Sequence, residues 1–339
     1  MSTVFTTENN IRAFLEKNKF ADAARALLKN QKENWEQLSE GYKSLVTVKS
    51  KIFSFEGFEI KVQRNNKRIV SSSAKVDDES IKKRVCFLCK ENLPEKQKGI
   101  LYNNKYIILG NPFPIFPEHF TLSYTQHSPQ KIEYSFGDFL SLAKDLSEYY
   151  TVFYNGPECG ASAPDHLHFQ AGTKNFMPLE KEFNQYKRKY GKFLFEKNNL
   201  AINFFDDGLR RFLSLESNNL ELLLNRFIEF YNIYSEFSNS KIEPMMNILA
   251  VYENKTMWRV LIFLREKHRP SFFYEKGENN FLWSPAAVDL GGVCIIPKEE
   301  NFNMITKDII ITGFNQITIS RDKFLLIIEK LKQNISDKY

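Results

Sequence analysis

The sequence predicts an α+β protein with mainly antiparallel sheets and flanking helices. Segments with the two-residue period of strands are mixed with segments of helical period, without the regular alternation that a parallel sheet requires. The 339 residues are 42% hydrophobic and 14% aromatic, which is enough for a large core and excludes a disordered chain. Each half of the chain has several strands and one long helix. The pattern therefore allows two related halves, although no repeated sequence proves a duplication.

The N-terminal segment has a helical pattern. Ile11, Phe14 and Leu15 recur at spacings typical of one helix face, and the pattern continues to about residue 45. We expect residues 1–48 to form a helical extension that precedes the two halves. From residue 50 the period changes to two, which predicts a hairpin over 52–62 that turns at Gly57.

The other elements are expected on either side of a boundary near residue 182. A polar loop at 63–78 and a charged stretch at 180–192 separate periodic segments. Residues 49–182 would form the first half and residues 183–339 the second. Within them we expect strands at 102–109, 120–124, 152–154, 166–171, 193–205, 211–215, 246–252, 258–265 and 293–297, and helices at 136–150, 220–237 and 321–332.

Charge and hydropathy narrow the function classes. The net charge of +6 suits an anionic small ligand, but no run of basic residues indicates nucleic-acid binding. The N-terminus lacks the basic and apolar regions of a signal peptide. The longest nearly uncharged stretch, 279–297, is interrupted by Asp289, a proline and glycines, so it does not predict a membrane span. We expect a cytoplasmic protein.

One segment concentrates residues that can bind and attack a phosphate. If 166–171 is a strand, His166, His168 and Gln170 face one side of the sheet and Leu167 and Phe169 the other. A neutral imidazole is a good phosphoryl nucleophile, and an amide can hydrogen-bond a phosphate oxygen without adding charge. Upstream, glycines that allow close approach of the backbone and one hydroxyl complete a phosphate loop: Gly156, Gly160 and Ser162.

A second signal is the pair Cys86 and Cys89, separated by two residues. A redox motif is expected in a βαβ context, which is not apparent here, whereas zinc needs two more ligands. We choose His127 and His166 for these; the remaining cysteines, Cys159 and Cys294, fit small buried residues better. The alternative is a pair of buried thiols without a metal.

Two further groups could hold the rest of a nucleotide. The Pro-rich segment 111–117 contains Asn111 and Phe113 and could form an apolar wall that stacks a base. Cations near strand ends could bind the phosphates that are not attacked. They are Arg64, Arg68, Arg265, Lys267 and Arg269.

The order of these motifs resembles the histidine-triad (HIT-like) superfamily. It is most similar to the transferase branch, which includes galactose-1-phosphate uridylyltransferase, diadenosine tetraphosphate phosphorylase and the GDP-sugar phosphorylases. The segment His166-Leu-His168-Phe-Gln170 ends in Gln like that branch, whereas hydrolases of the superfamily usually have a third His. The chain also resembles an uncharacterised bacterial group, a domain of unknown function, in which the CFLC and DHxHFQAG segments recur.

The resemblance implies a fold of HIT-like antiparallel sheets and a role for each motif residue. His168 matches the nucleophile that forms a nucleotidyl-histidine intermediate, and Gln170 and Ser162 match residues that contact the transferred phosphate. Asn155 matches an asparagine at the start of the phosphate loop. In zinc-containing members the first His binds a structural zinc, which maps onto Cys86, Cys89, His127 and His166.

The resemblance therefore implies a nucleotidyltransferase or phosphorylase. Its donor would be a nucleotide-sugar or a dinucleoside polyphosphate, and its acceptor phosphate or a sugar phosphate. The alternatives are a nucleotide hydrolase that uses the same histidine with water, and a non-catalytic nucleotide- or RNA-binding module with structural zinc. One more residue separates Ser162 from His166 than in the uridylyltransferase, and the second-half His-Trp-His segment of that enzyme is missing. The base, the sugar, the acceptor and the oligomeric state stay open.

Overall fold

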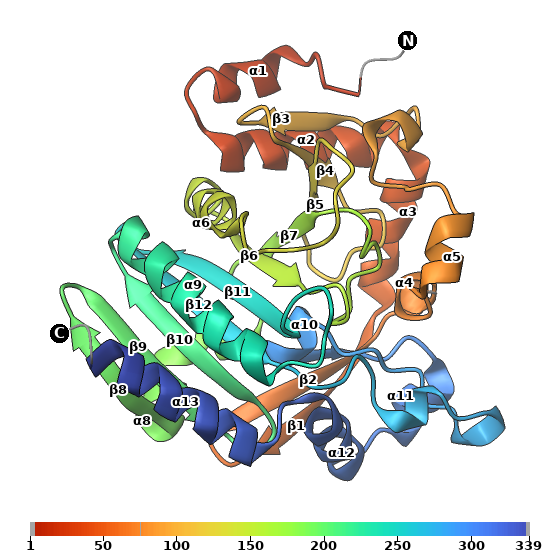
Figure 1. The fold of residues 1–339 in the computed structure, drawn as a ribbon. Helices are drawn as coiled ribbons and strands as arrows, with labels where there is room; N and C mark the ends of the chain where they lie inside the picture. Colours follow the sequence, from red (N-terminus) through yellow and green to blue (C-terminus); the bar gives the residue numbers. More distant parts are fainter. Residues whose placement is uncertain (1–3, 75, 337–339) are drawn as a thin grey trace.

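A ten-stranded antiparallel sheet forms the centre of the computed structural model, which describes residues 4–74 and 76–336 (Figure 1). The strand order is β3-β4-β5-β7-β6-β11-β12-β10-β9-β8. The predicted α+β class with antiparallel sheets and flanking helices is confirmed. The strands of this sheet are β3 (Gly99–Tyr102), β4 (Tyr106–Gly110), β5 (His119–Tyr124), β6 (Tyr150–Asn155), β7 (His168–Thr173), β8 (Gly191–Lys197), β9 (Leu200–Asp206), β10 (Arg211–Ser217), β11 (Met246–Glu253) and β12 (Met257–Leu264).

The strand order shows two halves with the same topology. Strands β3, β4, β5, β7 and β6 run inwards from one edge, and β8, β9, β10, β12 and β11 run inwards from the other. The halves meet where β6 pairs with β11. In each half a helix joins the third and fourth strands in chain order. In the first half α6 (Phe136–Asp145) joins β5 to β6, and in the second α9 (Leu220–Phe237) joins β10 to β11. The two halves of the sheet thus share one connectivity.

Within the ten-stranded sheet, each half begins with a hairpin that turns at two asparagines. Asn103 and Asn104 have φ values of 46° and 55°, and Asn198 and Asn199 have values of 51° and 63°. Asn tolerates this left-handed conformation better than most residues, so the pair closes a tight hairpin turn. The segments predicted as single strands, 102–109 and 193–205, are divided by these turns into β3–β4 and β8–β9.

The helices cover the sheet unequally. One face packs against α6, α9 and the C-terminal α13 (Arg321–Ser336) and, near β3 and β4, against the N-terminal helices α1 (Asn9–Leu15), α2 (Phe20–Asn34) and α3 (Glu36–Ser44). On the other face, the second half is covered by a small sheet of β1 (Lys49–Phe55), β2 (Phe58–Arg64) and β13 (Val293–Ile295). The remaining helices are α4 (Ile69–Ser72), α5 (Asp78–Lys83), α7 (Pro178–Lys181), α8 (Phe183–Tyr190), α10 (Ala287–Leu290), α11 (Glu299–Met304) and α12 (Lys307–Ile317).

Several elements differ from the expectations. The helix predicted over 136–150 ends at Asp145, because Tyr150 already belongs to β6. The polar stretches 63–78 and 180–192 contain short helices, and α10 to α12 were not expected at all. The hairpin of β1 and β2 pairs with β13 of the second half rather than with strands of the first. No described helix is both long and apolar enough to cross a membrane.

Candidate active site

A cavity of about 340 Å³ lies on the other face of the first half, beside the small sheet, whose Ile295 also lines it. His168 and Gln170 reach it from β7, because alternation places Phe169 and Ala171 in the core on the other face. The expected orientation of this strand is confirmed for those residues. His166 is an exception, since β7 begins only at His168 and the ring of His166 turns towards the two cysteines instead.

Backbone contacts determine the tautomer of His168. Its Nδ1 lies 2.8 Å from the carbonyl oxygen of His166, so Nδ1 carries the proton and donates to that oxygen. The unprotonated Nε2 is then the ring nitrogen that is free to attack. Burial lowers the pKa of His168 to about 4, which keeps the ring neutral at pH 7.

Gln130 holds the backbone of His168. Its side-chain amide accepts a hydrogen bond from the His168 N–H at 2.8 Å and donates to the carbonyl oxygens of His168 and Asn155, both at 2.9 Å. The side chain is fully buried. It therefore ties the start of β7 to the end of β6 and fixes where the imidazole stands. No sequence pattern pointed to this residue.

The phosphate loop closes one side of the cavity. Gly160 and Ser162 line it. Gly160 has φ 94°, and a Cβ at this position would lie only 2.7 Å from the Cβ of Ala286, so both the conformation and the space require glycine. Asn155 lies beneath them and also lines the cavity. Gly156 is turned away, against the carbonyl oxygen of Met246.

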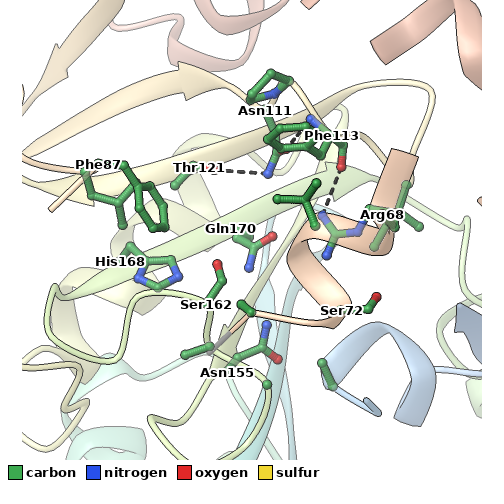
Figure 2. Close-up of a pocket in the computed structure, with 18 of the residues that line it drawn as sticks. Arg68, Ser72, Phe87, Asn111, Phe113, Thr121, Asn155, Ser162, His168 and Gln170 are labelled. Carbon is green, nitrogen blue, oxygen red and sulfur yellow. Dashed lines mark hydrogen bonds between the residues drawn. The ribbon is translucent and has the colours of Figure 1, made fainter. Parts of the chain in front are cut away.

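The opposite wall is apolar. Phe113 and Phe87 face the cavity (Figure 2). Trp35, Leu88 and Leu109 also line it. Asn111 also lines it, but its amide is used internally: it accepts from the Phe113 N–H and donates to Thr121. Phe113 of the Pro-rich segment thus lines the cavity, and Asn111 shapes this wall.

Two of the five candidate cations line the cavity. Arg68 donates to the Phe113 carbonyl oxygen at 3.0 Å, and Arg269 to Ser284 at 2.9 Å. Among the described residues neither forms an ion pair with a carboxylate, and the Nε of Arg68 is buried without a partner. Both positive charges are thus available to an anion in the cavity.

The other three candidate cations lie elsewhere. Arg64 pairs with Glu299 at 2.9 Å, and Lys267 is exposed. Arg265 is buried, where it donates to Asn247 and to the carbonyl oxygens of Pro285, Lys267 and His268. Its position after a strand suggested a phosphate contact, but the structure gives its guanidinium internal acceptors instead.

The four predicted metal ligands come together beside the cavity. Ligand atoms of Cys86, Cys89, His127 and His166 all lie within 4.8 Å of one another. The Nδ1 of His166 faces both thiols, at 3.3 and 3.5 Å, while its Nε2 lies 2.8 Å from the Tyr124 carbonyl oxygen. Holding the outer ring nitrogen on a carbonyl is typical of metal-binding histidines. Two thiols and two imidazoles are the donor set of structural zinc.

Sequence comparison matches part of the chain to one family model. The family described as "Domain of unknown function (DUF4922)" matches residues 27–173, a range that contains the metal-ligand group and the β7 motif. No curated protein matches the chain in sequence.

Structural comparisons identify related folds. The crystal structure of yeast Ap4A phosphorylase Apa2 has a TM-score of 0.55 and 16% identity, covering 84% of this chain and 94% of that one. The same yeast protein in complex with Ap4A and in complex with AMP gives TM-scores of 0.52 at 16% and 17% identity, covering 84% of this chain and 97% of that one in both cases. The two proteins share a fold.

Proposed function

We propose that the chain is a nucleotidyltransferase or phosphorylase that works through a nucleotidyl-histidine on His168. The observation that carries this proposal is the tautomer of His168: the backbone fixes the proton on Nδ1 and leaves Nε2 free in a cavity that also contains Gln170 and Ser162. The fold supports it, since the similar yeast enzyme is an Ap4A phosphorylase whose structures contain Ap4A or AMP.

The reaction would take two displacements. The Nε2 of His168 attacks the α-phosphorus of the donor; a nitrogen–phosphorus bond forms as the bond to the bridging oxygen breaks, and the rest of the donor leaves. Phosphate or a sugar phosphate then attacks the same phosphorus, and the ring is released. Two inversions give overall retention at phosphorus, with ping-pong kinetics.

The remaining groups have distinct roles in this scheme. The aromatic wall would stack the base, and Gln170, Ser162 and Asn155 would contact the transferred phosphate. Zinc bound by Cys86, Cys89, His127 and His166 would join the cysteine loop to the start of β7 and act structurally. We propose a dinucleoside polyphosphate or a nucleotide-sugar as the donor.

Incubation with donors labelled at the α-phosphate, in the absence of acceptor, tests the proposal. The panel contains Ap4A and several nucleotide-sugars. We expect one donor to leave label on the protein that is labile to acid and stable to base, as a phosphoramidate is. Release of free nucleotide without an acceptor would instead indicate the hydrolase, and binding without label or turnover would indicate a binding module.

Replacement of Gln170 measures the contribution of its amide. We expect Gln170→Ala to form the same intermediate about 10²–10³-fold more slowly, the usual loss for one preorganised donor to a developing charge. Rapid-quench measurement of the labelling rate gives this number. An unchanged rate would remove Gln170 from the phosphate site.

A matched pair of variants distinguishes a cation inside the cavity from one outside it. We expect Arg68→Ala to raise the Kd for a donor about tenfold or more, because the outer phosphates lose a charge-assisted hydrogen bond. Lys267→Ala, which removes an exposed cation outside the cavity, should leave the Kd unchanged. Equal effects of both variants would mean that only the overall charge of the protein matters. Titration calorimetry with the identified donor distinguishes these results.

A further inference from the structure

Two amides of the candidate site have their oxygen atoms already occupied. The Oε1 of Gln170 lies 3.0 Å from the Nε2 of His119. The Oδ1 of Asn155 accepts from the Nδ2 of Asn247 and from the N–H of Ala287, both at 2.8 Å. An amide whose oxygen is bound on one side presents its NH₂ group on the other. Figure 2 shows the nitrogen atoms of Gln170 and Asn155 pointing into the space beside His168.

The orientation of Gln170 follows from a backbone donor. The N–H of Ile115 lies 3.2 Å from the Nδ1 of His119 and can only donate, so this ring nitrogen must be the acceptor. In the neutral ring the proton is then on Nε2, which donates to Gln170. Burial lowers the pKa of His119 to about 3, with the charge of Arg68 acting in the same direction, so the ring is neutral at pH 7. Tyr42 holds the backbone of His119 through two more hydrogen bonds.

The orientation of Asn155 also follows from groups that can only donate. The Ala287 N–H requires an oxygen at its end of the amide. Asn247 is oriented in turn by Arg265, whose guanidinium lies 2.6 Å from its Oδ1, so that Nδ2 faces Asn155 and the Cys159 carbonyl oxygen. Asn247 and Arg265 both belong to the second half and are buried.

We propose that His119 and Asn247 are positioning residues, which lock the amides of Gln170 and Asn155 with their NH₂ groups towards the phosphate attacked by His168. The proposal rests on the proposed function for the identity of the substrate. The orientations of the two amides rest only on the hydrogen-bond donors around them. It also assigns a task to Arg265, which orients Asn247 rather than binding a phosphate. An amide that cannot rotate needs no reorganisation when charge develops on the phosphate oxygens.

NMR of the unaltered protein tests the orientation of the Gln170 amide by His119 and needs no substrate. Long-range proton–nitrogen correlation of the histidine rings at pH 7 distinguishes the two neutral tautomers. We expect His119 to carry its proton on Nε2 and His168 on Nδ1. A proton on Nδ1 of His119 would overturn the assignment, since Nε2 would then accept from the Gln170 amide and turn its oxygen towards the cavity.

Double-mutant cycles separate positioning from a general structural role. We expect His119→Phe and Asn247→Asp each to slow labelling from α-labelled Ap4A on the order of tenfold, the equivalent of one hydrogen bond. Asn247→Asp retains a hydrogen-bond acceptor for the guanidinium of Arg265, and this contact favours folding of the variant. In a Gln170→Ala background, His119→Phe should have no further effect, and likewise Asn247→Asp in an Asn155→Ala background. Effects that multiply in both backgrounds would overturn the proposal.

Failure of the proposed function would look different. If the unaltered protein takes no label from Ap4A or any nucleotide-sugar, the transferase proposal fails, and the ring tautomers then decide the orientation alone. A variant that fails to fold is recognised by its circular dichroism, in which case the NMR result decides in the same way.

Discussion

His168→Gly is expected to abolish covalent labelling and to reduce turnover by about 10⁴-fold or more, the scale seen when a catalytic nucleophile is removed. Nucleotide affinity should change little, because the base and the outer phosphates contact other parts of the cavity. The labelling assay and titration calorimetry on the same preparation separate the two effects. A glycine variant that still takes label would place the intermediate on another residue.

Imidazole in solution provides the control for this variant. The glycine leaves a space the size of the missing ring beside Gln170, and free imidazole can enter it and attack the same phosphorus. We expect partial recovery of turnover that rises with imidazole concentration, with label appearing on imidazole rather than on protein. Recovery in Gln170→Ala under the same conditions would show that the effect is not specific to the missing ring.

Cys86→Ser is expected to remove zinc and to lower the melting temperature by about 5 °C or more. A structural zinc site contributes on the order of 10 kcal/mol in small peptides, and only a few kcal/mol are needed for such a shift in a chain of this size. The purified protein should contain one zinc per chain by elemental analysis, and the variant none.

Cys294→Ala is the control, because this thiol is also buried but lies on β13, away from the ligand group. It should retain zinc and lose little stability. If the unaltered protein contains no zinc and Cys86→Ser melts at the same temperature, the cysteines are a pair of buried thiols, the alternative that the sequence left open.

The fold could be predicted to the extent that local pattern determines it. Period and composition are local properties, so the strands and the long helices α9 and α13 were recognised near their observed positions. The pairing of β2 with β13 was not predicted, because residues more than 200 apart in the sequence meet there. The Asn-Asn turns at 103–104 and 198–199 occupy matching places in the two halves of the sheet, but hydrophobic period alone does not detect them.

The candidate site, too, could be predicted where a local motif determines it and not where tertiary contacts do. Motif spacing placed His168, Gln170 and Ser162, which all reach one cavity, and it grouped the four metal ligands that the fold brings together. His119, Gln130 and Asn247 could not be recognised, since a buried polar side chain has no sequence signature and its partner is set by tertiary contacts. Arg265 was misread for the same reason: a cation after a strand can face a ligand or a set of carbonyls.

The connection between β6 and β7 and the connection between β11 and β12 differ in length, which limits what the second half of the sheet can do. Between β6 and β7 the chain makes the long loop 156–167, whereas β11 and β12 are joined by the short turn 254–256. The matching position of the second half therefore has no room for a second phosphate loop. A chain whose two halves share one strand order would then carry a single reactive centre. Random mutagenesis should find its second half more permissive, except along the buried line from Arg265 to Asn247 and at the residues that line the cavity, such as Arg269 and Ala286.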